Sequence, residues 1–221
     1  MSAGVELWLI RHGETEWSLD GRHTSTTDIP LTEHGRQRAL ELKEYLEGKK
    51  FAAVLVSPRQ RAMETCRLAG YGDVAVIDDG LQEWNYGDAE GKTTAQMREL
   101  RPGWSVWSSA IVGGESVEQV GARADGVIAR AVAAAVADPT HDDDKAVVMD
   151  GLPKASGPPN RAVALFAHAH ILRILAARWV GLAAVDGQRL ARGTGRVSVR
   201  VDERETRGIE RWNRSFEEGS E

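Results

Sequence analysis

Residues 5–13 read VELWLIRHG, and this stretch contains a pattern that recurs along the chain. Residues 5–10 are a short apolar run of strand-forming residues, interrupted only by Glu6, and the run stops abruptly at Arg11-His12-Gly13. The change predicts a buried strand that ends in a polar loop. Ligands of open parallel sheets bind beyond the carboxyl ends of the strands, so this loop is a candidate site.

The same order of strand, polar tip and helix recurs twice. Residues 52–56 are a short apolar run that ends at Ser57-Pro58, where the proline is expected in the first turn of the next helix. Residues 162–167 are a third apolar run, which ends at His168, and residues 171–180 follow as a buried helix. Strands that alternate with helices predict a mostly parallel sheet that is covered on both faces.

Hydrophobic periodicity predicts the remaining elements. Helices are expected at 32–48 and 116–136, and short strands at 74–77, 197–201 and 209–212. The strand at 197–201 alternates apolar residues with Ser198 and Arg200, as an edge strand with one solvent face does, and the last strand is expected to pair with it. The predicted fold is a three-layer α/β/α sandwich with a mostly parallel central sheet and an antiparallel edge strand.

The 221 residues are expected to form one domain, because this length falls between one and two typical domains and no internal repeat divides the chain. Residues 138–161 are rich in aspartate, glycine and proline, which predicts a flexible insertion. We expect a short strand at 146–149 within it. We interpret the insertion as a surface excursion in preference to an active-site lid.

Charge and composition exclude several classes of function. The 28 basic and 33 acidic residues leave a net charge of −5, which provides no long-range attraction for nucleic acid or an anionic membrane. Any anionic ligand therefore needs a local basic pocket. The single cysteine, Cys66, excludes an intrachain disulfide and a zinc site of several thiolates. Without a signal peptide or an apolar stretch of about 18 residues, a soluble cytoplasmic protein is expected.

Arg11-His12-Gly13 places a cation, an imidazole and a flexible glycine at one strand end, a combination that suits a phosphate ester. An unprotonated imidazole nitrogen is a competent nucleophile near neutral pH, and Arg11 can direct two donors at phosphoryl oxygens. Gly13 lets the backbone approach the same oxygens. The alternative is an ordinary surface pair of arginine and histidine, and the rest of the chain must distinguish the two.

Three further motifs provide that context: SPRQRAMET at 57–65, LQEWNYGDAEG at 81–91 and FAHAH at 166–170. Together with RHGET at 11–15, they resemble the histidine phosphatase superfamily, and the resemblance extends from Leu7 to about Trp212. Members of this family include cofactor-dependent phosphoglycerate mutases, fructose and sedoheptulose bisphosphatases, and small acid phosphatases. Trp17-Ser18 resembles the acid phosphatase and sedoheptulose bisphosphatase branches.

The resemblance implies a role for each matching position. His12 matches the nucleophile that becomes phosphohistidine, and Glu83 matches the proton donor to the leaving group. Arg11, Arg61 and His168 match the phosphate pocket, with His168 counted among the catalytic residues. Ala169 replaces the usual glycine after the second histidine, but its backbone N–H survives as a phosphate donor.

The rim of the expected pocket is less well defined. Ser18 replaces a frequent asparagine, and the stretch around His23 departs from the asparagine, glutamine and glycine of many mutases. Arg59 and Arg61 compete for one phosphate role, and the family pattern matches Arg61. The substrate-binding candidates are Ser18, His23, Thr24, Arg59, Tyr86 and His170.

Other functions are compatible with parts of the same pattern. His12, Glu83 and His168 also form a two-histidine, one-carboxylate set that suits iron or zinc, but Arg11 and Arg61 would repel a metal ion. A phosphate-recognition module without catalysis would normally lack one of the three. Phosphoglycerate mutase activity is the alternative within the family, although the adjacent arginine pair expected of it is absent.

The sequence therefore predicts a phosphatase of the acid or sugar phosphatase type that needs no metal and no other cofactor. Its expected partner is a small phosphorylated metabolite, with no nucleic acid and no membrane. The oligomeric state stays open, a homodimer included.

Overall fold

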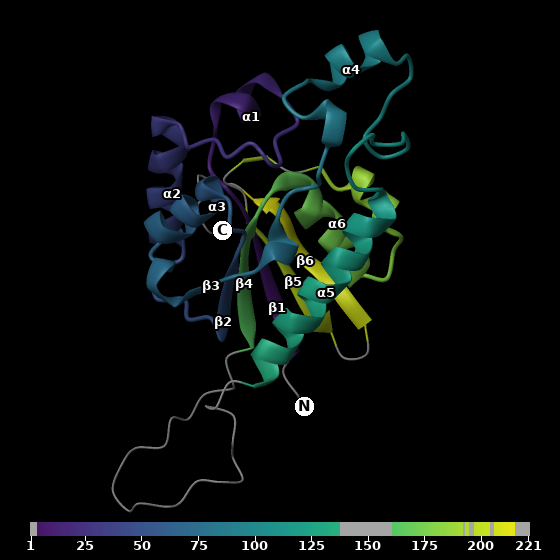
Figure 1. Cartoon of the computed structure of the whole chain (residues 1–221). Helices are drawn as coiled ribbons and strands as arrows, with labels where there is room; N and C mark the ends of the chain where they lie inside the picture. The colour runs from purple at the N-terminus through teal and green to yellow at the C-terminus, as the bar shows by residue number, and fades with distance from the viewer. Residues whose placement is uncertain (1–3, 138–160, 192, 195–196, 204–205, 215–221) are drawn as a thin grey trace, which may run out of the picture.

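The computed structural model describes residues 4–137, 161–191, 193–194, 197–203 and 206–214 (Figure 1). The strand expected at 146–149 and nearly all of the insertion expected at 138–161 lie outside these residues. The described strands are β1 (Glu6–Arg11), β2 (Ala53–Val56), β3 (Ala75–Ile77), β4 (Ala162–Ala167), β5 (Val197–Glu203) and β6 (Thr206–Arg214). The α-helices are α1 (Glu16–Asp20), α2 (Glu33–Tyr45), α3 (Gln60–Leu68), α4 (Thr94–Leu100), α5 (Val117–Val136) and α6 (Ala169–Trp179).

The described strands form one sheet in the order β3-β2-β4-β1-β5-β6, which confirms the α/β prediction. β1, β2, β3 and β4 pair in parallel, and β5 and β6 extend the sheet with antiparallel pairing. One detail of the prediction was wrong. β6 pairs with β5 as expected, but Ser198 does not face solvent: it is fully buried, with its hydroxyl accepting from the Asn213 amide (2.8 Å).

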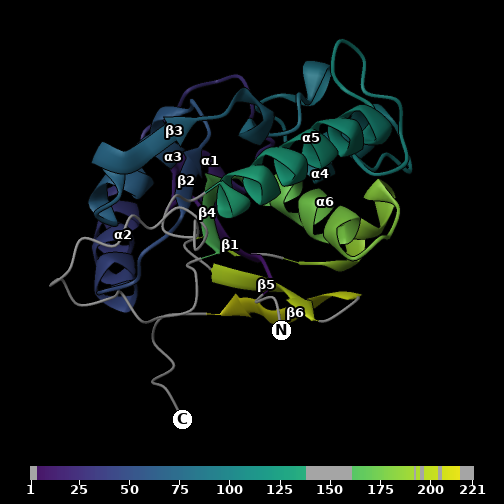
Figure 2. The ribbon, with the colours of Figure 1, turned by 90° about the horizontal axis from the view of Figure 1, so that it is seen from below.

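Helices cover both faces of the sheet, as Figures 1 and 2 show. On one face, Ile10, Val56 and Phe166 belong to a core with buried residues of α2 and α3. On the other face, Leu9 and Leu165 belong to a core with α5 and α6. Neighbouring residues of a strand point to opposite faces, so strands buried on both sides read as continuous apolar runs.

Two helices begin in ways that the sequence did not predict. α3 begins at Gln60, two residues after Pro58, and the Gln60 amide donates to the Asp28 carboxylate from a distant loop (2.9 Å). α1 is a five-residue helix that starts from a capping box between Thr15 and Ser18. Both helix starts depend on hydrogen bonds of polar side chains. Hydrophobic periodicity carries no information about these bonds.

The sheet brings the three polar tips to one edge. His12 follows β1, Ser57 follows β2 and His168 follows β4. The amides of His12 and Ser57 donate to the carbonyls of Ala167 and Phe166 on β4, at 3.0 and 2.9 Å, so neighbouring tips remain in register. α1 and α4 lie beyond this edge of the sheet (Figure 1).

α2 packs on the loop after β1 through two glycines. A Cβ atom on Gly35 would lie 2.3 Å from the Glu14 carbonyl oxygen, and one on Gly13 would lie 2.6 Å from the Gly35 oxygen. Both obstacles are backbone atoms, which cannot move aside cheaply. The close approach holds the His12 loop against the start of α2.

Gly35→Ala is expected to lower the free energy of unfolding by about 1–3 kcal/mol, because the added methyl group overpacks a backbone contact. Urea unfolding measures the loss. Gly208→Ala is the matched control, since a Cβ at Gly208 meets no atom within 4 Å. Equal stability of the two variants would contradict the close backbone contact.

Candidate active site

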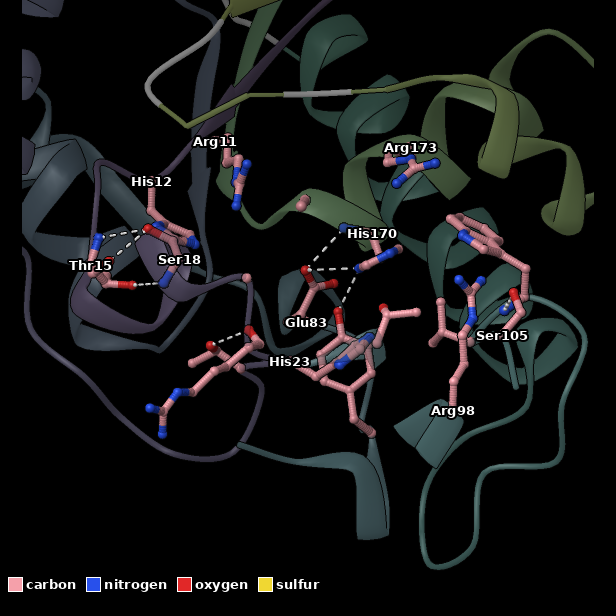
Figure 3. Close-up of a pocket in the computed structure, with 18 residues that line it drawn as sticks. Arg11, His12, Thr15, Ser18, His23, Glu83, Arg98, Ser105, His170 and Arg173 are labelled. Carbon is pink, nitrogen blue, oxygen red and sulfur yellow. Dashed lines mark hydrogen bonds and ion pairs between the residues drawn. The ribbon is translucent and has the colours of Figure 1, made fainter. Parts of the chain in front are cut away.

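The strand tips border a cavity of about 410 Å³, whose lining is drawn in Figure 3. The charged residues of the lining are Arg11, Arg22, Arg98, Arg173 and Glu83. Four cations against one carboxylate make this a basic pocket in a chain of net charge −5, as an anionic ligand requires. Arg11 and His12 lie at one end of the cavity and Arg98 and Arg173 at the other, with Glu83 and His170 between them (Figure 3).

His12 is oriented by its own backbone. Nδ1 of the buried ring lies 2.6 Å from the Gly13 carbonyl oxygen. A carbonyl oxygen can only accept, so Nδ1 carries the ring proton and Nε2 keeps its lone pair. The Gly13 amide donates to the Thr65 hydroxyl (3.0 Å), which donates in turn to the Arg61 carbonyl (2.7 Å). These bonds fix the ring with Nε2 unprotonated, as a nucleophilic nitrogen would have to be.

Burial, together with the Arg11 and Arg61 guanidinium groups, lowers the pKa of His12 well below its usual value. The neutral ring therefore persists into acidic solution, where an ordinary histidine would be protonated. His12 therefore keeps, below pH 6.5, the unprotonated nitrogen that a nucleophilic role would require.

The lowered pKa of His12 also makes stability depend on pH. The unfolded chain takes up a proton at His12 near pH 6.5, and the folded chain does so only at lower pH. The free energy of unfolding therefore falls as the pH drops below 6.5, by up to about 1.4 kcal/mol per pH unit for this group. In urea unfolding at about pH 7 and about pH 5.5, His12→Gln should lose less stability than the native protein. An equal loss in both would contradict the lowered pKa.

His168 and Arg61 are buried near His12 and do not line the cavity. Arg61 Nε donates to Nδ1 of His168 (3.2 Å), so the proton of this ring is on Nε2, which donates to the Ser57 hydroxyl (2.8 Å). Burial and the Arg61 charge lower the pKa of His168 well below its usual value, which keeps the ring neutral. The rings of His12 and His168 are 5.1 Å apart between centroids.

The other end of Arg61 supports a loop. Its terminal nitrogens donate to the carbonyls of Thr24 (3.1 Å), Ser25 (3.3 Å) and Thr27 (3.1 Å). Arg61 and His168 are both fully buried, and neither belongs to the cavity lining. Their direct contact with phosphate stays a prediction, whereas Arg11 and Ala169 do line the cavity.

Glu83 meets the start of α6. One carboxylate oxygen accepts from the amides of Trp84 and Ile171, and the other accepts from the His170 amide, each at 2.9 Å. Three backbone donors thus hold the carboxylate at the N-terminus of a helix, where negative charge is favoured. The side chain also lines the cavity, so it can reach a bound ester.

Several rim residues from the sequence analysis do line the cavity: Ser18, His23, Thr24, Tyr86 and His170. The Tyr86 hydroxyl lies 2.6 Å from Nδ1 of His170, and burial followed by Arg173 lowers the pKa of His170 well below its usual value. His23 Nδ1 donates to the Lys92 carbonyl (2.7 Å). Arg59 lies outside the lining, where it donates to Thr26 and Gln82.

Nine lining residues were not among the predicted site residues, and four of these carry a charge or a large ring: Arg22, Arg98, Trp107 and Arg173. A signal existed for Arg173, because it follows His170 by three positions on a predicted helix and so shares its face. Arg98 and Trp107 come from the segment after the 81–91 loop, whose path across the pocket no local pattern indicates.

The metal alternative does not fit the geometry. Both ring nitrogens of His168 are engaged, by Arg61 and by Ser57, so neither is available to a metal ion. Within the described residues, no group of three or more histidine, cysteine, aspartate or glutamate side chains could hold one.

No helix in this same part of the chain is long and apolar enough to cross a membrane.

Comparison with known proteins agrees with the four motifs. Residues 7–153 match the histidine phosphatase superfamily, branch 1. An acid phosphatase of Mycobacterium tuberculosis is 37% identical over 87% of this chain and 84% of its own length. A sedoheptulose 1,7-bisphosphatase of Saccharomyces cerevisiae is 33% identical over 79% and 67%. The solved structure of an open reading frame product of M. tuberculosis superposes with a TM-score of 0.80 at 33% identity, covering 96% of this chain and 98% of that one.

Proposed function

Because the chain belongs to branch 1 of the histidine phosphatase superfamily, we propose that it hydrolyses small organic phosphomonoesters, of the sugar phosphate type, through a phosphohistidine at His12. The observation that carries the proposal is the His12 ring, whose Nε2 is unprotonated beside an arginine-lined cavity. A relative that covers most of the chain is an acid phosphatase, which supports hydrolysis. Cys66, the single cysteine, is buried, and we place the activity in the cytoplasm, where disulfides are rare.

In the first step, His12 Nε2 attacks phosphorus and the bond to the ester oxygen breaks. Glu83 acts here in its protonated form and gives its proton to that oxygen, so an alcohol leaves instead of an alkoxide. Arg11 stabilises the phosphoryl oxygens. At about 4 Å and an effective dielectric constant near 20, one arginine contributes on the order of 4 kcal/mol of attraction per unit charge.

In the second step, a water molecule attacks the phosphohistidine and the bond between phosphorus and nitrogen breaks. The Glu83 carboxylate accepts the proton of the water, and His12 regains its neutral form. Phosphate leaves, and the site returns to its starting state with no metal or cofactor consumed. Neutral His12 is a suitable leaving group because its lowered pKa disfavours the protonated ring.

The test is phosphate release from a panel of phosphomonoesters in the presence of a chelator. We expect turnover that resists the chelator, and the preferred ester indicates the substrate class. 3-Phosphoglycerate is tested with its bisphosphate cofactor in parallel, because a Gloeobacter violaceus mutase is 40% identical over 41% of this chain. Isomerisation without phosphate release would indicate a mutase. Activity that disappears with the chelator would contradict the mechanism.

A further inference from the structure

A bidentate ion pair lies beside the segment that carries Glu83 but outside the cavity. Arg123 of α5 donates from Nε to one carboxylate oxygen of Glu115 (3.0 Å) and from a terminal nitrogen to the other (2.8 Å). Both side chains are partly buried, and neither belongs to the cavity lining. The mechanism proposed above gives this pair no role.

The remaining donors of Arg123 all point to the segment of Glu83. One terminal nitrogen donates to the carbonyls of Gly80 (2.9 Å) and Gln82 (2.6 Å), and the other reaches the Glu83 carbonyl (3.4 Å). A guanidinium has five N–H donors, so these three bonds and the two to Glu115 account for all of them. Arg123 is thus fully engaged within the protein, and its partners indicate what it does.

Glu115 holds the other side of the same segment. One of its carboxylate oxygens also accepts from the Asn85 amide (2.9 Å), and its own amide donates to the Asn85 carbonyl (3.0 Å). Its carbonyl accepts from the indole N–H of Trp84 (2.8 Å). Arg123 and Glu115 therefore bond the residues on both sides of Glu83 to the beginning of α5.

The segment around Glu83 depends on such contacts for its path. Residues 82–86 are irregular and connect two 3₁₀ helices, Asp79–Leu81 and Gly87–Ala89. The Glu83 side chain extends from this segment into the cavity (Figure 3). A proton donor must come within hydrogen-bond reach of the leaving oxygen, and a misplacement of about 1 Å can slow a reaction by about 10²-fold.

We infer that Arg123 and Glu115 position Glu83 for proton transfer to the ester oxygen. They are positioning residues, because they bond the chain around Glu83 and do not line the cavity. The inference rests on the proposed function and deepens it by naming the ion pair that places its proton donor. The alternative is a pair that only stabilises the fold, and the two roles differ in which substrates they affect.

The test compares two esters whose leaving groups differ in their need for a proton. Butyl phosphate releases an alkoxide that must be protonated, whereas p-nitrophenolate is a stable anion that leaves without a proton. Arg123→Lys replaces the planar fork by a point charge, which cannot make the five bonds. We expect kcat to fall at least about tenfold for butyl phosphate and less than about threefold for p-nitrophenyl phosphate.

Two further variants support the comparison. Glu115→Gln removes the charge that the Arg123 fork binds and should show the same contrast, so it decides the question if Arg123→Lys does not fold. Arg130→Gln is the matched control. Arg130 lies seven residues further along α5 and forms a bidentate pair with Asp78 (2.9 and 2.7 Å), but no hydrogen bond joins it to residues 82–85 in the described part of the chain. It should keep the native ratio of the two kcat values.

A double variant shows whether Arg123 acts through Glu83. Once Glu83→Gln has removed the proton donor, adding Arg123→Lys should slow butyl phosphate hydrolysis by less than about threefold more, because nothing is left to position. A pair that only stabilises the fold would slow both esters equally, and it would slow them again in the Glu83→Gln background. Either result, or native rates in both Arg123→Lys and Glu115→Gln, would overturn the inference.

Glu83→Gln alone separates this inference from the proposed function. If Glu83→Gln shows the contrast between the two esters but Arg123→Lys and Glu115→Gln do not, only the inference fails. If Glu83→Gln shows no contrast, or the native protein hydrolyses neither ester, the proposed function fails and the inference fails with it.

Discussion

Replacing His12 by alanine is expected to lower kcat/KM for phosphomonoester hydrolysis by on the order of 10⁴-fold or more. The variant loses the Nε2 lone pair that attacks phosphorus in the proposed mechanism. Phosphate release from the preferred ester measures the loss. His34→Ala is the matched control, because His34 is an exposed residue of α2 outside the cavity lining, and it should retain native activity.

Trapping the phosphohistidine intermediate tests the same prediction directly. Acid-labile, alkali-stable phosphate should accumulate on the native protein when turnover is stopped rapidly, and none should be found on His12→Ala. His12→Gln provides a second variant that retains a polar side chain, with circular dichroism to confirm folding. Either variant folding normally and retaining more than about a tenth of native activity would exclude His12 as the nucleophile.

Removing the Glu83 carboxyl group is expected to slow hydrolysis in proportion to how poor the leaving group is. Glu83→Gln cannot protonate an alkoxide, so kcat for an alkyl phosphate should fall by about 10²- to 10⁴-fold. p-Nitrophenolate leaves without a proton, so p-nitrophenyl phosphate should lose far less. Steady-state kinetics on both esters measures the contrast.

The contrast separates two roles of Glu83, because its carboxylate also accepts from two backbone amides at the start of α6 and from the Trp84 amide. If the residue only positions α6, Glu83→Gln should slow both esters equally, and that result would contradict its role as a proton donor. Glu118→Gln provides the control, since Glu118 is an exposed carboxylate in the first turn of α5. It should leave both rates unchanged.

The fold could be predicted largely because its signals are local. The apolar runs that became β1, β2 and β4 are buried on both faces, so their composition is nearly continuous and their ends are sharp. The prediction that Ser198 of β5 faces solvent was wrong for the opposite reason. Whether a strand is interior depends on what pairs with its far side, and Ser198 reads as a solvent position until Asn213 of β6 is brought beside it.

The site could be predicted as a set of residues but not as an arrangement. Once the strands are parallel, the tips carrying His12, Ser57 and His168 must meet at one edge. The direction of each side chain depends on partners far along the chain. Arg61 illustrates this. Its guanidinium donates to His168 and to the loop carbonyls of Thr24 and Ser25, and these partners are more than thirty residues away in each direction along the chain.

By itself, the sequence determined the order of strands and helices, the polar tips and the family to which their motifs correspond. These depend on periodicity and on residue type at short spacing, which the chain carries locally. Only the tertiary structure decided the tautomer of His12, the enclosure of Glu83 by amides and the placement of Arg98 and Arg173 in one cavity lining. Hydrogen bonds and charges act over a few ångströms in space, and residues far apart in the sequence come that close only in the folded chain.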